Sequence, residues 1–288
     1  MAEPRAKGIG ADLRASAPSA QLQDDAVGMH YASRKMATDY AKLYQRSDSV
    51  ARFLKSRLYI VSRALADIPG GDLLDVGCGP GVFVRELLNS RPGEFNITAV
   101  DRSPAMVEAC NARIAGDGNA KCFVARIEAL PFETDSFDVV LAMGVLEYTD
   151  AAAALAELAR VARPQGHIIV TMHNPRSPYR FVERYVYGSA KGGARIAKSL
   201  AKSRSFRGVR RARVQIHAVS ERGLRRMMDN VGVRPVRTVY YDVTFTVPPF
   251  DRYIRRWAKG WQRNLERTVG RSWWKGLGTA YMIVARKL

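Results

Sequence analysis

Short apolar runs alternate with stretches of helical periodicity through the middle of the chain. Residues 139–142, for example, are all apolar, which is typical of a strand buried on both faces of a sheet. The pattern predicts strands at 72–77, 96–101, 121–125, 137–143 and 167–173, and helices at 81–90, 104–115 and 150–162. Strands separated by helices of this length imply a parallel sheet with right-handed crossovers, and hence an α/β fold.

Further helices and strands are predicted before and after this core in the sequence. Residues 30–67 read as two helices, and in the second the apolar residues recur at helical spacing from Val50 to Leu65. Ser220 is a suitable N-cap for a helix that follows it. Residues 236–247 and 279–286 read as two closing strands.

The chain therefore divides into a tail and one large domain. Residues 1–28 mix small, polar and charged residues without periodicity, which predicts a disordered N-terminal tail. Residues 29–288 are predicted to form the domain. Its predicted parts are N-terminal helices (29–68), a ligand-binding core (70–173), a basic insertion (174–216) and a C-terminal substrate and lid region with the closing strands (217–288).

Residues 73–82 (Leu-Leu-Asp-Val-Gly-Cys-Gly-Pro-Gly-Val) carry the strongest functional signal. An apolar run containing Asp75 turns through three glycines into the next predicted helix. Glycines let the backbone turn sharply and approach a ligand, and the helix behind them presents unpaired N–H groups. Asp101 ends the second predicted strand, where an acid can accept both hydroxyls of a ribose. The pattern predicts a nucleoside site.

The glycine spacing bears on which nucleoside is bound. Dinucleotide folds favour G-x-G-x-x-G, whereas here the third glycine comes one residue early and Val82 stands in its place. The segment resembles motif I of the class I S-adenosylmethionine (SAM) methyltransferases. Residues 129–141, 145–148 and 160–170 are similar, in the same order, to later segments of the ubiquinone/menaquinone-type small-molecule branch. An NAD enzyme is the alternative.

The resemblance covers about residues 70–175 and implies a Rossmann-like three-layer sandwich. Its sheet would have seven mostly parallel strands, the last one antiparallel, with the N-terminal helices and a helical lid added. The implied cofactor is S-adenosyl-L-methionine. Its methionine end would lie at Asp75 and the turn, the ribose at Asp101 and the adenine beside Arg102. The turn contributes Gly77, Cys78 and Gly79.

Further cofactor contacts follow from the same resemblance. After the third strand the family usually has an acid that bonds the adenine amino group, but here Arg126 stands there, followed by Ile127 and Glu128. Backbone groups of Ile127 could replace that contact. Met143 would border the sulfonium. Tyr31 lies where the family often folds an N-terminal helix over the cofactor, although it could equally be a core position of an amphipathic helix.

Methyl transfer is an in-line displacement at carbon, so the protein mainly aligns the acceptor and excludes water. His173, Tyr148 and Glu147 lie at or after the ends of neighbouring predicted strands, and are the candidate catalytic residues. A histidine suits a general base at neutral pH, with a structural histidine as the alternative. His217 could face the pocket and bind substrate. His167, at the opposite end of its strand, is expected to be structural.

No metal is predicted. The metal-dependent catechol branch of the family uses an Asp–Asn pair after the fifth strand, and residues 172–175 (Met-His-Asn-Pro) carry no such acid. The three cysteines, at 78, 110 and 122, are odd in number and lack metal-like spacing. That argues against a disulfide framework and against a zinc site.

The net charge of +19 is unevenly placed. Residues 71–172 hold eight Arg and Lys against fourteen Asp and Glu, whereas 176–213 hold twelve against one and 252–288 ten against one. Trp257 and Trp261 share the apolar stripe of a predicted helix that is otherwise basic. We expect them to bind substrate as part of a lid. A membrane surface and an acidic carrier protein are the alternatives.

Two partner classes are not favoured. Aromatic residues interleave with arginines in the basic insertion and could stack on bases, but no recognised RNA-binding module accompanies them. No run approaches eighteen apolar residues and no secretory leader opens the chain, which predicts a cytoplasmic protein that does not span a membrane. Peripheral membrane contact stays open.

The sequence predicts a SAM-dependent methyltransferase of small-molecule biosynthesis or secondary metabolism. The expected acceptor is small and largely apolar or anionic, such as a quinone, a polyketide, or a prenylated or aromatic natural product. O-methylation is favoured because His173 could deprotonate a hydroxyl, while C- and N-methylation stay open. The alternative from another class is a nucleic-acid-binding protein or RNA methyltransferase that uses the Arg-rich segment.

Overall fold

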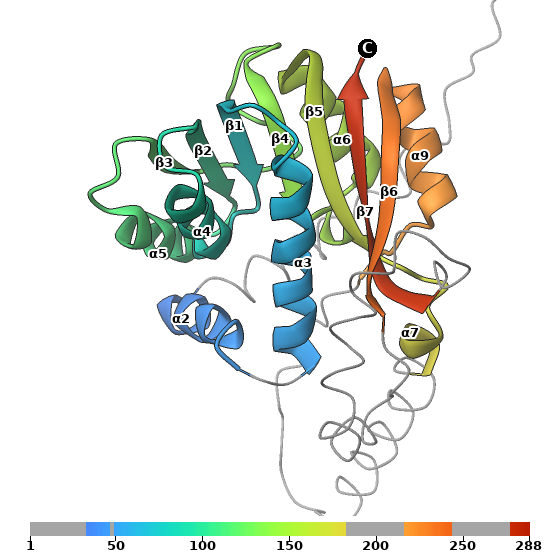
Figure 1. Ribbon diagram of the computed structural model, residues 1–288, viewed down its shortest axis with the longest axis horizontal. Helices are drawn as coiled ribbons and strands as arrows, with labels where there is room; N and C mark the ends of the chain where they lie inside the picture. The colour runs from blue at the N-terminus through green and yellow to red at the C-terminus, as the bar shows by residue number, and fades with distance from the viewer. Residues whose placement is uncertain (1–32, 47–48, 183–215, 244–276) are drawn as a thin grey trace, which may run out of the picture.

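The computed structural model describes residues 33–46, 49–182, 216–243 and 277–288, which form a seven-stranded sheet flanked by helices (Figure 1). The strand order is β3-β2-β1-β4-β5-β7-β6. The strands are β1 (Gly71–Val76), β2 (Phe95–Asp101), β3 (Ala120–Val124), β4 (Phe137–Met143), β5 (Ala162–His173), β6 (Val233–Val243) and β7 (Gly278–Lys287). β1 to β5 pair in parallel, and β7 is antiparallel to both of its neighbours. The predicted sheet is confirmed.

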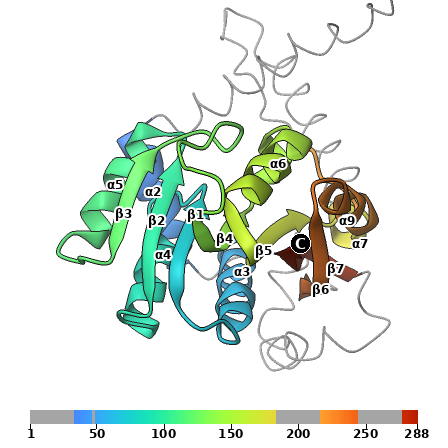
Figure 2. The same ribbon diagram turned by 90° about the horizontal axis from the view of Figure 1, so that it is seen from above.

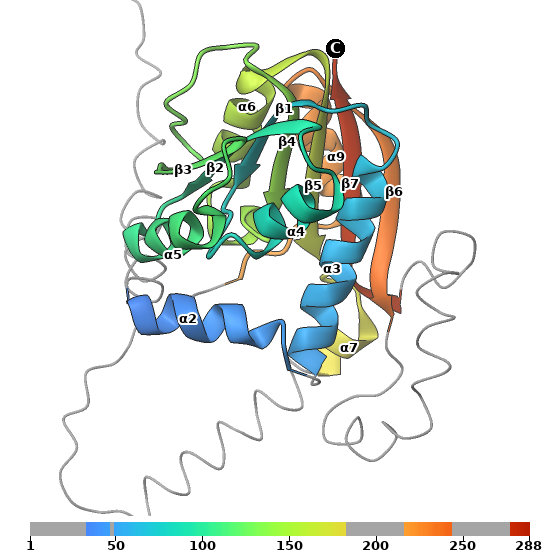
Figure 3. The same ribbon diagram turned by 60° about the vertical axis from the view of Figure 1, so that its left-hand side comes forward.

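Helices cover both faces of this sheet and give the predicted three layers (Figure 2). On one face α3 (Ser49–Leu65), α4 (Val82–Ser90) and α5 (Pro104–Ile114) pack through residues such as Leu58 and Leu87. On the other face α6 (Ala151–Val161) and α9 (Glu221–Asn230) pack through Leu158 and Met228. α2 (Arg34–Leu43) contacts α5, and Figure 3 shows it beneath that helix and the parallel strands. The short η1 (Leu146–Tyr148) follows β4, and α7 (Pro178–Val182) follows β5.

Side-chain caps fix the beginning of several helices. The hydroxyl of Ser103 accepts the N–H of Met106 at 3.3 Å, with Pro104 as the first residue of α5. The hydroxyl of Ser220 accepts the N–H of Gly223 at 3.3 Å at the start of α9. Both starts agree with the sequence prediction.

Two strands begin earlier than predicted. β5 begins at Ala162 rather than 167, because Ala162 pairs with Phe137 before a register shift, and Gln165 takes a φ of 62° there. β6 begins at Val233 rather than 236, since it pairs with β7 from that residue onward. Pro235 is tolerated because β6 is the edge strand. The first residues of β5 and β6 include polar residues and a proline, which do not give the apolar pattern by which strands are predicted.

Some predictions fall outside the described residues. They concern the tail 1–28, Tyr31, most of the basic insertion, Trp257 and Trp261. Among the helices that the structure describes, none is long and apolar enough to cross a lipid bilayer.

Candidate functional site

The glycine turn between β1 and α4 has a backbone that favours glycine. Gly77 and Gly79 have φ values of 76° and 53°, and a Cβ on Gly77 would lie 2.2 Å from Cγ2 of Val145. The N–H groups of Gly77 and Cys78 donate to the carbonyl of Val100 on β2 at 2.7 and 3.0 Å. These bonds hold the turn against the sheet.

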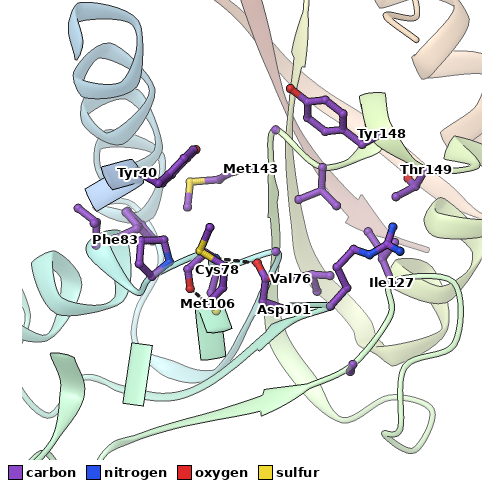
Figure 4. A pocket seen from close by; sticks show the side chains of 18 of the residues that line it. Tyr40, Val76, Cys78, Phe83, Asp101, Met106, Ile127, Met143, Tyr148 and Thr149 are labelled. Atoms are coloured by element: carbon purple, nitrogen blue, oxygen red, sulfur yellow. Dashed lines mark hydrogen bonds between the residues drawn. The ribbon is translucent and has the colours of Figure 1, made fainter. Parts of the chain in front are cut away.

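A cavity, which we call the turn cavity, opens beside the glycine turn (Figure 4). It lies at the carboxyl ends of parallel strands, where open α/β sheets bind ligands. Most of the predicted cofactor residues line it: Gly77, Cys78, Gly79, Asp101, Arg102, Ile127, Glu128 and Met143. Tyr148, predicted as catalytic, lines it as well.

Asp101 is held firmly at this cavity. The N–H of Gly79 donates to its Oδ2 and the N–H of Ser103 to its Oδ1, both at 2.9 Å. Burial raises the pKa of Asp101, and the two backbone N–H groups oppose that rise. Each carboxylate oxygen has more than one lone pair, so each can also accept a ligand hydroxyl.

Asp75 lies fully buried beneath the turn and does not itself line the cavity. Neither of its carboxylate oxygens has a hydrogen-bond partner among the described residues. Burial raises the pKa of Asp75 to about 8. A buried carboxyl group without a partner is rare in native proteins and indicates a group that a ligand completes.

Arg57 of α3 is a buried cation on the other side of the same cavity. It is 7% exposed, and its Nε has no hydrogen-bond partner within the described part of the chain. A Cβ on Gly144 would lie 2.1 Å from its Nη1, so the guanidinium rests on the backbone that follows β4. The hydroxyl of Tyr40 lies 3.4 Å from Nη2. Asp75 and Arg57 thus place a carboxyl group and a guanidinium here, each with a buried atom that lacks a hydrogen-bond partner among the described residues.

The sequence analysis did not single out the residues that cover the turn cavity from the N-terminal side. Tyr40 and Tyr44, at the end of α2, line it together with Arg57. Two signals were present in the sequence. The tyrosines are one helical turn apart, and Arg57 falls on the apolar face that α3 forms with Leu54 and Leu58.

A second cavity, which we call the outer cavity, adjoins the first. Tyr40, Arg57, Gly144 and Tyr148 line both of them. The outer cavity is otherwise lined by Leu43, Val50, Arg52, Phe53, Leu54, Glu147, His173, Tyr179, Arg180 and Asp242. Of the predicted catalytic residues, Tyr148 lines both cavities, whereas Glu147 and His173 line the outer cavity only.

His173 and Glu147 form a pair in the outer cavity. Oε1 of Glu147 lies 3.1 Å from Nδ1 of His173, within ion-pair distance but without hydrogen-bond alignment. Glu147 is 2% exposed, and its Oε2 has no hydrogen-bond partner among the residues described. The His173 ring stacks on Phe53 with centroids 5.3 Å apart. The sequence analysis named both residues but did not predict their contact.

The other residues singled out in the sequence either line the turn cavity or lie outside both cavities. Nε of Arg126 lies 3.7 Å from Oε2 of Glu128, and both residues line the turn cavity. The backbone N–H of His217 donates to the carbonyl of Glu147 at 2.8 Å, but its side chain is exposed and lines neither cavity. His167 lies in the middle of β5, not at its start as expected, and pairs with Arg286 of β7. Burial, and secondarily the charge of Arg286, lowers the pKa of His167.

Comparison with known proteins adds the following. A family model described as a methyltransferase domain matches residues 74–170. A ubiquinone/menaquinone biosynthesis C-methyltransferase of Geotalea daltonii is 34% identical over 106 residues, covering 35% of this chain and 45% of that protein. A demethylmenaquinone methyltransferase of Clavibacter sepedonicus is 30% identical over 138 residues, covering 47% and 55%. The chain thus spans about half the length of the curated relatives it matches.

The fold has a counterpart among solved structures. Magnesium protoporphyrin IX methyltransferase from Synechocystis, with bound SAH, superposes with a TM-score of 0.57 at 14% sequence identity. The match covers 92% of this chain and 100% of that one. At this identity the likeness concerns the fold alone.

Proposed function

We propose that this chain, whose residues 74–170 form a class I SAM-dependent methyltransferase domain, transfers the methyl group of SAM to a small, largely apolar acceptor. The observation that carries the proposal is the Asp75 carboxyl group and the Arg57 guanidinium beside a turn cavity that Asp101 lines, each with a buried atom that lacks a hydrogen-bond partner among the described residues. An α-amino acid has an ammonium and a carboxylate a short distance apart. In the methionine part of SAM, the ammonium would pair with the Asp75 carboxylate and the carboxylate with the Arg57 guanidinium.

In this proposal the cofactor lies along the turn cavity. The ammonium approaches Asp75 beneath the glycine turn, and Arg57 takes the carboxylate. The ribose hydroxyls bond to Asp101, whose two oxygens are already fixed by backbone N–H groups. The adenine lies between Arg102 and Ile127, and Met143 borders the sulfonium. Charge-assisted bonds of this kind are the stronger class of hydrogen bond.

The acceptor would enter from the outer cavity. The methyl carbon must lie in line between the sulfur and the attacking atom, so the acceptor and the cofactor meet where Gly144 and Tyr148 line both cavities. Phe53, Tyr179 and His173 give the outer cavity an aromatic wall. The Arg57 and Arg180 guanidiniums lie 5.7 and 5.5 Å from the Phe53 ring centroid. Such a wall favours a planar, electron-rich or anionic ring.

His173 would serve as the base for an acceptor hydroxyl. Glu147, buried beside Nδ1, stabilises the imidazolium that forms when Nε2 takes the proton. The deprotonated ring is nucleophilic at its oxygen and at the ring carbons next to it. We propose oxygen as the methylated atom. Carbon is the alternative, and the C-methyltransferase relative supports it.

Methyl transfer from labelled SAM tests the proposal. The acceptors are phenols, hydroquinones, prenylated quinols and indoles, each assayed with the full-length chain, and product NMR identifies the methylated atom. Transfer to a hydroxylated ring, abolished by heat denaturation of the protein, supports the function. Binding of SAM without transfer to any ring in the series contradicts the proposed acceptor class.

A further inference from the structure

Three cysteines from separate parts of the chain meet behind the glycine turn. Cys78 lies in the turn, Cys110 on α5 and Cys122 on β3, and all three are buried free thiols. Their Sγ atoms all lie within 4.8 Å of one another, and those of Cys78 and Cys122 are 3.5 Å apart. Nothing in the proposed methyl transfer uses them.

We propose that Cys78, Cys110 and Cys122 form a three-sulfur site that binds one soft monovalent metal ion, Cu(I). The three residues are the only cysteines of the chain. We call them the sulfur cluster.

The geometry of the sulfur cluster suits a three-coordinate ion. A metal–thiolate bond of about 2.3 Å places three sulfurs about 4 Å apart around a trigonal centre. The separations, 3.5 Å for Cys78 and Cys122 and at most 4.8 Å for the set, are close to that value. Small side-chain rotations would therefore bring all three sulfurs to bonding distance.

The set of ligands favours copper over zinc. No His, Asp or Glu of the described residues joins the cysteines within that distance. A structural zinc site is almost always tetrahedral and would need a fourth ligand. Thiolates are soft ligands, and Cu(I) is among the ions that such ligands select.

Binding changes no oxidation state. As Cu(I) binds, each coordinating thiol releases its proton to solvent and a copper–thiolate bond forms, because the thiolate is the form of cysteine that binds metals.

An ion bound by the sulfur cluster would link the glycine turn to α5 and β3. A Cβ on Gly81 would lie 2.6 Å from Sγ of Cys110, so the turn packs directly on the cluster. Cys78 is 8% exposed and lines the turn cavity, which gives the ion a route in. Bound Cu(I) would connect the turn, α5 and β3.

The test uses the reduced full-length protein under anaerobic conditions. Cu(I) is added in the presence of a chromogenic Cu(I) chelator, and retained copper is measured with the near-ultraviolet sulfur-to-copper absorption. We expect one retained equivalent. Cys78→Ser, Cys110→Ser and Cys122→Ser should each weaken retention about 100-fold or more, since a lost ligand costs at least as much as a lost outer-shell partner. Met143→Leu, which changes another sulfur at the same cavity, should retain copper like the wild type.

Thermal unfolding without metal shows whether each serine variant is folded, and alanine replaces serine at any position where it is not. The proposal is wrong if the chelator removes copper from the wild type as readily as from the variant lacking all three cysteines. It is also wrong if the folded single variants keep the ion, or if Zn(II) is retained and Cu(I) is not.

Discussion

Replacing Asp75 by asparagine should stabilise the protein in the absence of SAM. The Asp75 carboxyl group is fully buried without a partner among the described residues, and burial raises its pKa from 3.8 to about 8. Above pH 4 the unfolded chain carries an ionised Asp75, whereas the folded protein must keep the group protonated. Folding is therefore disfavoured by an amount that grows as the pH rises from about 4 to about 8 and then stays constant. The amide of the substituted side chain would be neutral throughout.

The free-energy cost of burying Asp75 can be calculated from the shift in its pKa. Each pKa unit corresponds to about 1.4 kcal/mol, so the penalty is about 2 kcal/mol at pH 5 and about 4 kcal/mol at pH 7. The stability difference between Asp75→Asn and the wild type should thus widen by about 2–3 kcal/mol between these two pH values. The change in the stability difference between pH 5 and pH 7 is more informative than either value alone. A change in packing caused by the amide is the same at both pH values and therefore cancels.

Urea unfolding of both proteins at pH 5 and pH 7, without SAM, measures the difference. A companion calorimetric titration at pH 7 should show that wild-type protein releases a proton when it binds SAM, because the ammonium favours the ionised carboxylate. Asp75→Asn should release none and bind SAM about 10- to 100-fold more weakly. A stability difference that does not change with pH would refute the reasoning. An unaltered SAM affinity would remove Asp75 from the site.

Three other changes probe the remaining parts of the site. Asp101→Ala should weaken SAM binding by about 1.5–3 kcal/mol in calorimetry through loss of charge-assisted bonds; equal affinity would exclude it from the ribose site. His173→Ala should lower kcat and remove the loss of rate toward acidic pH that protonation of a general base causes, and Glu147→Gln should lower kcat less. An unchanged kcat and pH profile for His173→Ala would exclude it as the base. Trp257→Ala with Trp261→Ala should raise the acceptor KM while sparing SAM affinity. If that double variant instead only loses sedimentation with anionic vesicles, the two residues are a membrane anchor.

Local signals made the cofactor half of the fold predictable. The glycine turn, the acid at the end of β2 and the N-cap of α5 each depend on residues close in sequence. The alternation of strands and helices then restricts the topology to a parallel sheet. Strand starts were less predictable. Pairing with β4 and β7 extends β5 and β6 through Pro164 and Pro235, residues that local propensity does not place in strands.

Features that depend on distant contacts were harder to predict. Arg57 becomes a site residue because α3 packs over the backbone that follows β4, and the sequence records only an arginine on an apolar face. The cysteines were judged by their spacing, which is irregular, yet a turn, a helix and a strand bring their sulfurs together. The His173–Glu147 contact likewise needs the ends of β4 and β5 to be neighbours.

The most direct test of the central claim is calorimetric titration of the wild-type protein with SAM and, separately, with NAD. We predict that SAM binds with a stoichiometry of one per chain and that NAD gives no binding heat. Binding of NAD without binding of SAM would contradict the assignment of the turn cavity to a methyl donor.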